Sequence, residues 1–226
     1  MKKTVVFIHG AFQGGWAWKQ LIDQLPNYNC YAPTLSTPQG NGLNEHVEQV
    51  CNLIEQNELT HITLIGHSYG GMVITGVVHR VPGLIKKIIY LDAVIAEPDH
   101  SLLDILGSDA QQFFNSLTFE QNGELLVQTF PAQAFGFDSP EHVDNYFHNH
   151  VPQALKTFTD KLAMKSPDQL SHIQKTYIRC ILANPFSATQ AEKAQKRGWA
   201  CYEIIAGHCP MLTNTQELAT LLQSIL

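Results

Sequence analysis

Short runs of apolar and β-branched residues alternate with longer amphipathic segments along most of this chain. That alternation is typical of βαβ units, in which strands lie parallel and helices cover both faces of the sheet. The strands are expected at Thr4–His9, Tyr28–Pro33, Ile62–Gly66, Ile85–Asp92, Thr176–Leu182 and Cys201–Ala206. The helices are expected at Trp16–Leu25, Leu43–Gln56, Gly70–Val81, Ala188–Arg197 and Thr215–Ile225. The pattern therefore predicts an α/β fold with a doubly wound, mostly parallel six-stranded sheet.

One interval, from about residue 98 to residue 171, has no βαβ period although phenylalanines continue through it. Asn122-Gly123 favours a two-residue hairpin between Leu117–Gln121 and Glu124–Thr129. Ser139-Pro140-Glu141 is typical of a helix start. An insertion this long between two sheet strands predicts a cap, and an ordinary packed extension is the alternative. At 226 residues the chain is expected to be one domain, 1–226, with this cap inserted.

Charge and cysteine content narrow the possible partners. The net charge of -6 gives no basic surface for nucleic acid or an anionic membrane, so a small molecule is the expected partner. Five cysteines without C-x-x-C spacing favour reduced thiols and a cytoplasmic protein. The apolar run after Met1-Lys2-Lys3 is too short for a signal peptide, and no stretch reaches transmembrane length. Oligomeric state is not predicted.

The motif Gly66-His67-Ser68-Tyr69-Gly70-Gly71 follows a predicted strand and opens a predicted helix. A nucleophile at this position sits on a tight turn that lifts its oxygen above the sheet edge. The flanking glycines are needed because a Cβ would collide with the neighbouring strand and helix. A bare G-x-S-x-G arises by chance in roughly one of a dozen chains this long. Its position between strand and helix is what makes Ser68 the candidate nucleophile.

Two further segments complete the predicted site. The first strand ends in His9-Gly10-Ala11-Phe12, which predicts that the backbone N–H groups of Ala11 and Tyr69 form an oxyanion hole; a simple turn is the alternative. His208 follows the last strand, and the order Ser then His is typical of α/β-hydrolases, so His208 is the predicted base. His148 and His150, in the predicted cap, are interpreted as solvated. No metal and no cofactor are expected.

These residues resemble the hydroxynitrile lyase and plant-type methylesterase branch of the α/β-hydrolase superfamily. The resemblance covers nearly the whole chain: the start at Thr4–Gly10, the pair in Gly15-Trp16-Ala17-Trp18, the serine motif, the hairpin and the Gly207-His208 loop. It implies an α/β-hydrolase fold, a small apolar pocket beneath the cap, and ester hydrolysis or, in the lyases, cyanohydrin cleavage. The lyases carry a Thr and a Lys where this chain has Gly10 and Cys209. Without that Lys to stabilise departing cyanide, ester hydrolysis is favoured.

The carboxylate that should orient His208 is expected at an unusual position. The family usually supplies it from the loop after the strand at Thr176–Leu182, but no Asp or Glu occurs between Asp168 and Glu192. Asp92 ends the strand that follows the serine helix, so it should lie beside Ser68 at the carboxyl edge of the sheet. Some haloalkane dehalogenases resemble this arrangement, although their nucleophile is an Asp. A structural, loop-capping Asp92 is the alternative, and Glu97 and Asp99 are reserve candidates.

Together these features predict a serine esterase that cleaves a small to medium carboxylic ester through an acyl-enzyme intermediate. Ser68 attacks, His208 transfers the proton, Asp92 orients His208, and water releases the acid. Two other functions stay open. One is a non-catalytic ligand-binding protein on a hydrolase fold, favoured by the missing carboxylate after Leu182. The other is an acyltransferase that uses an acceptor other than water.

Overall fold

The computed structural model describes residues 2–36, 40–135, 137, 139, 142, 144, 148–164, 170–183 and 185–226. Its core is a six-stranded sheet with the order β2-β1-β3-β4-β8-β9, in which every neighbouring pair is parallel. The strands are β1 (Lys3–Ile8), β2 (Tyr28–Tyr31), β3 (Ile62–His67), β4 (Ile85–Leu91), β8 (Gln174–Cys180) and β9 (Ala200–Ile204). The predicted six-stranded parallel sheet is confirmed, and each strand end lies within two residues of its predicted position.

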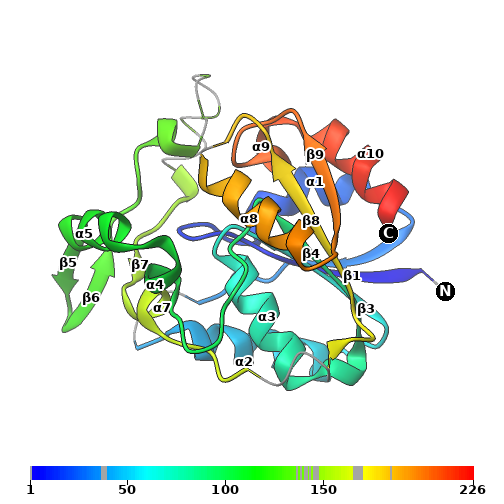
Figure 1. Ribbon diagram of the computed structural model, residues 1–226, viewed down its shortest axis with the longest axis horizontal. Coiled ribbons are helices and arrows are strands. Elements are labelled where there is room, and N and C mark those ends of the chain that lie inside the picture. Colours follow the sequence, from blue (N-terminus) through cyan, green and yellow to red (C-terminus); the bar gives the residue numbers. More distant parts are fainter. Residues whose placement is uncertain are drawn as a thin grey trace.

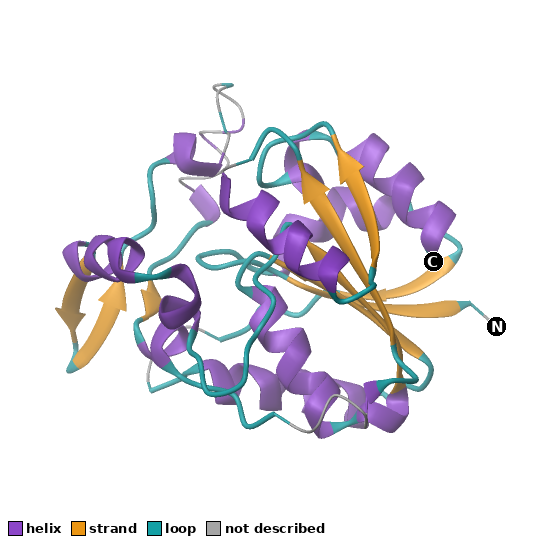
Figure 2. Cartoon of the chain, viewed as in Figure 1, coloured by secondary structure: helices purple, strands orange, loops and turns teal. Residues whose placement is uncertain are grey.

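Helices cover both faces of this sheet, as Figures 1 and 2 show. The helices that pack around the sheet are α1 (Lys19–Asp23), α2 (Leu43–Gln56), α3 (Gly70–Arg80), α8 (Pro185–Lys196), α9 (Pro210–Thr213) and α10 (Thr215–Ile225). Helices α1, α9 and α10 contact one another, and α2 packs against α3. All six residues of β3 are buried because helices cover both of its sides. None of the helices in the described part of the chain is long and apolar enough to cross a membrane.

Two helical predictions need adjustment, and two short helical elements were not predicted. The segment expected to be one helix from Trp16 begins as a 3₁₀ turn, Gly15–Trp18, and only then continues as α1. Helix α8 begins at Pro185, three residues earlier than expected, because proline is well suited to the first turn of a helix. The short helix α9 was not predicted, and a short 3₁₀ turn at Pro82–Leu84 precedes β4.

The chain between β4 and β8 leaves the large sheet and forms separate elements, here called the insertion (Leu102–Thr159). They are α4 (Leu102–Leu106), α5 (Ser108–Ser116), β5 (Thr118–Gln121), β6 (Glu124–Val127), a 3₁₀ turn (Ala132–Phe135), β7 (Gln153–Ala154) and α7 (Lys156–Thr159). In Figure 1 the insertion lies to the left of the large sheet, and both chain termini lie on the opposite side.

The hairpin predicted at Asn122-Gly123 is confirmed, since β5 and β6 pair antiparallel around it. Both turn residues have positive φ values, 55° and 82°, as a type I′ turn requires. Strand β7 adds to β6 and was not predicted. Of the predicted helix start at Ser139, only part can be compared, because Pro140 and Glu141 lie outside the described residues. The Ser139 hydroxyl accepts a hydrogen bond from the His142 N–H (3.2 Å), as a capping serine does.

Candidate active site

Ser68 lies on the turn between β3 and α3, with a φ of 52° that few residues other than glycine adopt. The backbone carbonyl of Ser68 closes the turn, because it accepts hydrogen bonds from the N–H groups of Gly71 and Val94, both at 3.1 Å. A Cβ on Gly66 would lie 2.5 Å from the backbone oxygen of Gly70. This close approach explains why the turn needs glycine before the serine, and it leaves the serine at the carboxyl edge of the sheet.

Asp92 directly follows β4, the strand beside β3, and it contacts His208. Its Oδ2 lies 2.7 Å from Nδ1 of His208, and its side chain is 1% exposed. Its Oδ1 accepts hydrogen bonds from the Cys180 N–H (3.0 Å) and from the Ser187 hydroxyl. Because the carboxylate accepts from Nδ1–H, the neutral imidazole carries its lone pair on Nε2. The structure therefore brings Asp92 and His208 together as the sequence predicted.

The two reserve carboxylates lie elsewhere. Glu97 forms ion pairs with Lys193 (3.0 Å) and Arg197 (2.7 Å) on the far end of α8. Asp99 is exposed on a turn. Of the three carboxylates considered from the sequence, only Asp92 is placed against the histidine.

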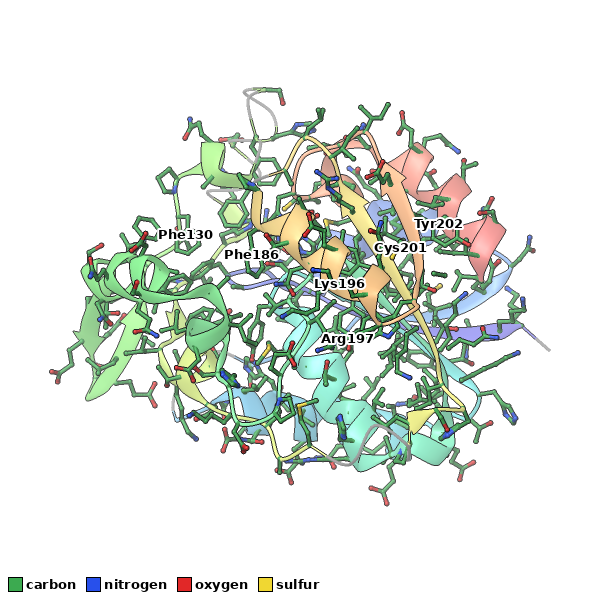
Figure 3. The ribbon with its side chains drawn as sticks, in the orientation of Figure 1. Phe130, Phe186, Lys196, Arg197, Cys201 and Tyr202 are labelled. Atoms are coloured by element: carbon green, nitrogen blue, oxygen red, sulfur yellow. The ribbon has the colours of Figure 1, made fainter. Side chains whose placement is uncertain are left out.

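Ser68, Asp92 and His208 line one cavity of about 290 Å³. Within the described residues the Ser68 hydroxyl forms no hydrogen bond to His208, which is common where catalytic contacts tighten only with substrate bound. Six phenylalanines supply much of the cavity wall: Phe12, Phe114, Phe130, Phe135, Phe158 and Phe186. Figure 3 shows Phe130 on the insertion side of this region and Phe186 at the start of α8.

The predicted oxyanion donors lie on two loops beside the serine. Ala11 and Tyr69 both line the cavity. In the described part of the chain, neither of their backbone N–H groups has a hydrogen-bond partner. The Tyr69 side chain is buried and its hydroxyl bonds Nδ1 of His46 (2.9 Å). A Cβ on Gly10 would lie 3.1 Å from that of Ser68, so glycine lets the first loop approach the serine.

Three buried histidines surround the site as neutral structural groups. His67 bonds the backbone oxygen of His208 through Nε2 at 2.7 Å, and burial holds its pKa well below the usual value. His9 accepts a hydrogen bond from the Leu35 N–H (3.0 Å), and burial lowers its pKa to about 4. Burial also lowers the pKa of His46. A neutral His67 therefore helps to hold the loop that carries His208 without adding charge to the site.

The histidines of the insertion differ from each other. His148 is exposed and pairs with Asp144 (3.5 Å), as expected for a solvated residue. His150 is partly buried between the rings of Trp16 (5.1 Å) and Phe135 (5.9 Å), so its interpretation as solvated is wrong. Aromatic packing against a partly buried imidazole leaves no signal in the sequence. Among the residues that the structure describes, no cluster of His, Cys, Asp or Glu could hold a metal ion.

Two functional neighbours were missed from the sequence, Ser187 and Gln153. Ser187 is buried in the first turn of α8, and the expected helix began after it. Gln153 is buried in β7, which was not expected at all. Cys209, which stands where the lyases carry Lys, is a buried thiol whose pKa burial raises to about 12. A buried neutral thiol cannot supply the positive charge that stabilises cyanide.

Comparison with known proteins identifies the class of this fold and site. The Alpha/beta hydrolase family matches residues 5–221, so the chain belongs to that family. This confirms the resemblance on which the sequence prediction depended.

Individual relatives narrow the class further. The chain is 30% identical to the carbendazim hydrolyzing esterase of Nocardioides sp. (strain SG-4G), over 97% of this chain and 98% of the relative. It is 22% identical to putative methylesterase 12, chloroplastic, of Arabidopsis thaliana, over 99% of this chain and 71% of the relative. An extracellular alpha/beta-hydrolase from Paenibacillus species has the same fold, with a TM-score of 0.84, 21% identity and 98% of each chain covered. The names of the first two relatives, an esterase and a methylesterase, support the prediction of a carboxylic-ester hydrolase.

Proposed function

We propose that this protein is a serine esterase that hydrolyses small to medium-sized carboxylic esters through an acyl-enzyme intermediate. The observation that carries the proposal is the 2.7 Å contact between Asp92 and His208 in the same cavity as Ser68. The carboxylate is the part of the site that the sequence left most open. Its place at the end of β4 supplies the acceptor that a catalytic histidine needs.

In the first half of the proposed reaction, Ser68 Oγ bonds to the ester carbonyl carbon while His208 Nε2 takes the hydroxyl proton. The carbonyl oxygen becomes an oxyanion and accepts hydrogen bonds from the N–H groups of Ala11 and Tyr69. Asp92 stabilises the imidazolium. The bond to the alcohol oxygen then breaks, and His208 returns the proton to the departing alkoxide, leaving an acyl ester on Ser68.

In the second half, a water molecule replaces the alcohol. His208 Nε2 takes a proton from this water as its oxygen bonds to the acyl carbon. The same two N–H groups hold the second oxyanion. The bond to Ser68 Oγ breaks, the serine recovers its proton from His208, and the carboxylic acid leaves. No redox step or cofactor is needed, because the overall reaction consumes only ester and water.

The cavity favours an uncharged, apolar substrate. Its lining contains six phenylalanines, and none of its described lining residues is a lysine or arginine. At about 290 Å³ it lies at the small end of the range for ligand sites. Four of these, Phe114, Phe130, Phe135 and Phe158, come from the insertion, which we propose acts as the predicted cap over a single domain. The five unpaired cysteines support the proposal of a reducing, cytoplasmic environment.

The two open alternatives have less support. The non-catalytic binding protein was favoured by a missing carboxylate, and the contact of Asp92 with His208 removes that reason. An acyltransferase would need an acceptor other than water in the second half of the reaction. Adding alcohols to the assay distinguishes it, because transfer yields new esters whereas hydrolysis yields only the free acid.

Rapid mixing with p-nitrophenyl acetate tests the proposal. We expect a burst of p-nitrophenolate that is stoichiometric with enzyme, followed by slower turnover. Ser68→Ala should abolish both phases, and Ser224→Ala, an exposed serine near the C-terminus, should retain them. Tight ligand binding without turnover would instead support the binding protein. Esters varied separately in acyl and alcohol length, with carbendazim included because of the Nocardioides relative, would then define the substrate.

A further inference from the structure

We propose that Gln153 is a positioning residue for the oxyanion hole, a role that rests on the proposed esterase function. Gln153 is 1% exposed and begins β7 in the insertion. Its side-chain Oε1 accepts a hydrogen bond from the backbone N–H of Phe12 at 2.9 Å, across 141 residues of sequence. Phe12 directly follows Ala11, so the insertion holds the loop that carries one predicted donor.

The hydrogen bonds of this loop leave one N–H available. The Gly10 N–H donates to the side chain of Gln13 (3.2 Å), and the Gln13 N–H donates to the carbonyl of Gly10 (3.4 Å). The Phe12 N–H is taken by Gln153. Within the described residues, only Ala11 of these four keeps a backbone N–H without a partner, and Ala11 lines the cavity of Ser68. Gln153 therefore engages the Phe12 N–H, which could otherwise compete for the oxyanion, and leaves the Ala11 N–H available for it.

The conformation of Phe12 explains why the loop needs this support. Phe12 has a φ of 66°, in the left-handed region where a large side chain is strained. Both of its backbone groups are held by the insertion, since its carbonyl accepts from the Val151 N–H (3.1 Å) and its N–H donates to Gln153. Without the bond to Gln153, the Ala11–Phe12 peptide could relax, and the neighbouring Ala11 N–H would turn with it.

The orientation of the Gln153 amide is itself determined by its neighbours. Its Nε2 donates to the Thr157 hydroxyl (2.7 Å), and that hydroxyl donates its single proton to the carbonyl of Ala154 (2.7 Å). Thr157 can therefore only accept from Gln153, so the amide must present its oxygen to Phe12. Pairing of Gln153 with Val127 in β6 fixes its backbone as well.

Three variants separate positioning from general structural support. Gln153→Met keeps the volume but removes the acceptor, whereas Gln153→Glu keeps an oxygen that can accept from Phe12. Gln190→Met is the matched control, because it removes the same kind of buried side-chain acceptor, here for the Ile95 N–H (3.0 Å), and leaves the Phe12 bond in place. Each is compared with wild type by kcat per titrated active site, KM, melting temperature and inhibition by an aliphatic trifluoromethyl ketone, which forms an oxyanion on the serine.

We expect Gln153→Met to lower kcat by roughly 10- to 100-fold with KM changed by less than about threefold, since a misplaced donor affects mainly the transition state. Ketone affinity should weaken by a similar factor. Gln153→Glu should recover most of kcat. Gln190→Met should melt earlier and keep kcat within about twofold of wild type.

A Gln153→Met enzyme that keeps the wild-type kcat and ketone affinity would overturn the inference, as would a Gln190→Met enzyme that loses as much kcat as Gln153→Met. In both cases wild-type turnover would leave the esterase proposal standing. A wild-type protein that releases no alcohol from any ester would overturn the proposed function and this inference together.

Discussion

The large sheet and the insertion contribute differently to the site. The sheet supplies Ser68 and Asp92 from the ends of neighbouring strands, and the loop after β9 supplies His208. The insertion supplies four of the six cavity phenylalanines and the side chain of Gln153. The sheet therefore places the groups proposed to form and break bonds, while the insertion shapes the space for substrate and holds one loop in position.

The two regions also differ in how firmly they fix their residues. Ser68 and Asp92 both have positive φ values, and both are held by the sheet: the Ser68 N–H donates to Leu91 (3.3 Å) and the Asp92 N–H to Ile178 (2.8 Å). In its described residues, the insertion has only the short antiparallel sheet β5-β6-β7 and brief helices. Changes at the sheet edge should thus affect catalysis, and changes to the cavity-lining residues of the insertion should mainly affect which substrates bind. Gln153 is the expected exception, because it holds the loop that carries the Ala11 N–H.

The largest effect should come from the sheet edge. Asp92→Asn keeps the shape of the side chain but favours the wrong histidine tautomer, so we expect kcat to fall by about 10⁴-fold. Steady-state kinetics with p-nitrophenyl acetate measures it, with circular dichroism to confirm folding. Glu97→Gln, which removes a nearby carboxylate that faces Lys193 and Arg197, should leave kcat unchanged. An Asp92→Asn enzyme within about threefold of wild type would rule out Asp92 as the acid.

A smaller effect is expected one step farther from the reacting atoms. Ser187→Ala removes a hydroxyl that donates to Asp92 but keeps the Cys180 N–H bond. Hydrogen bonds to charged groups contribute about 1.5–3 kcal/mol, so we expect kcat to fall roughly tenfold. Ser187→Thr, which retains the hydroxyl, should recover most of this loss in the same assay. An alanine variant as fast as wild type would show that Asp92 is oriented without Ser187.

The sheet side should also lose stability in mild acid. Burial lowers the pKa of His9, His46 and His67, so below their ordinary value of 6.5 the unfolded chain binds protons that the folded chain does not. The free energy of unfolding should therefore fall as pH drops from 6.5 towards 4. Each histidine contributes at most about 1.4 kcal/mol per pH unit in that window.

Urea unfolding between pH 7.5 and 5 measures this dependence. His46→Gln can keep the contacts to Tyr69 and Ser36 and should make the dependence shallower. His148→Asn, at an exposed position of the insertion, should leave it unchanged. An equal slope in wild type and His46→Gln would contradict the assignment of His46 as a buried neutral group.

The smallest effect on chemistry is expected for the phenylalanines that the insertion adds to the cavity wall. The Phe130 ring packs on the cavity wall against three other phenylalanine rings. The distances between ring centres are 5.0 Å to Phe12, 5.2 Å to Phe114 and 5.9 Å to Phe135. Phe130→Leu should change KM for esters with bulky groups by several-fold and leave kcat for p-nitrophenyl acetate within about twofold. Kinetics over an ester series tests this. If kcat for the acetate falls as far as in Ser187→Ala, the division between sheet and insertion is wrong.

The sequence predicted the residues that the large sheet positions, because the features that place them are local sequence patterns and the order of strands in the sheet. The apolar runs predicted the strands. Neighbouring parallel strands end at the same edge of the sheet, and this placed Asp92 beside Ser68 although the usual carboxylate after β8 is missing. His208 followed from its position after the last strand. These inferences need the order of elements and no detail of side-chain packing.

The remaining partners could not be predicted, because they depend on long-range pairing of single side chains. Gln153 reaches Phe12 across the insertion, and its strand has only two residues, too few for a periodic pattern. Ser187 was outside the expected helix because that helix was predicted to begin at Ala188, whereas α8 begins at Pro185. The partial burial of His150 depends on Trp16, which lies far away in the sequence, and on Phe135 of the insertion.

Covalent labelling with a fluorophosphonate, followed by intact-mass and peptide mass spectrometry, tests the central proposal most directly. We expect one adduct per chain, located on Ser68, absent in Ser68→Ala and formed much more slowly in Asp92→Asn. Such a result would show that the serine between β3 and α3 is activated through His208. Labelling at another residue, or equal labelling rates in wild type and Asp92→Asn, would contradict it.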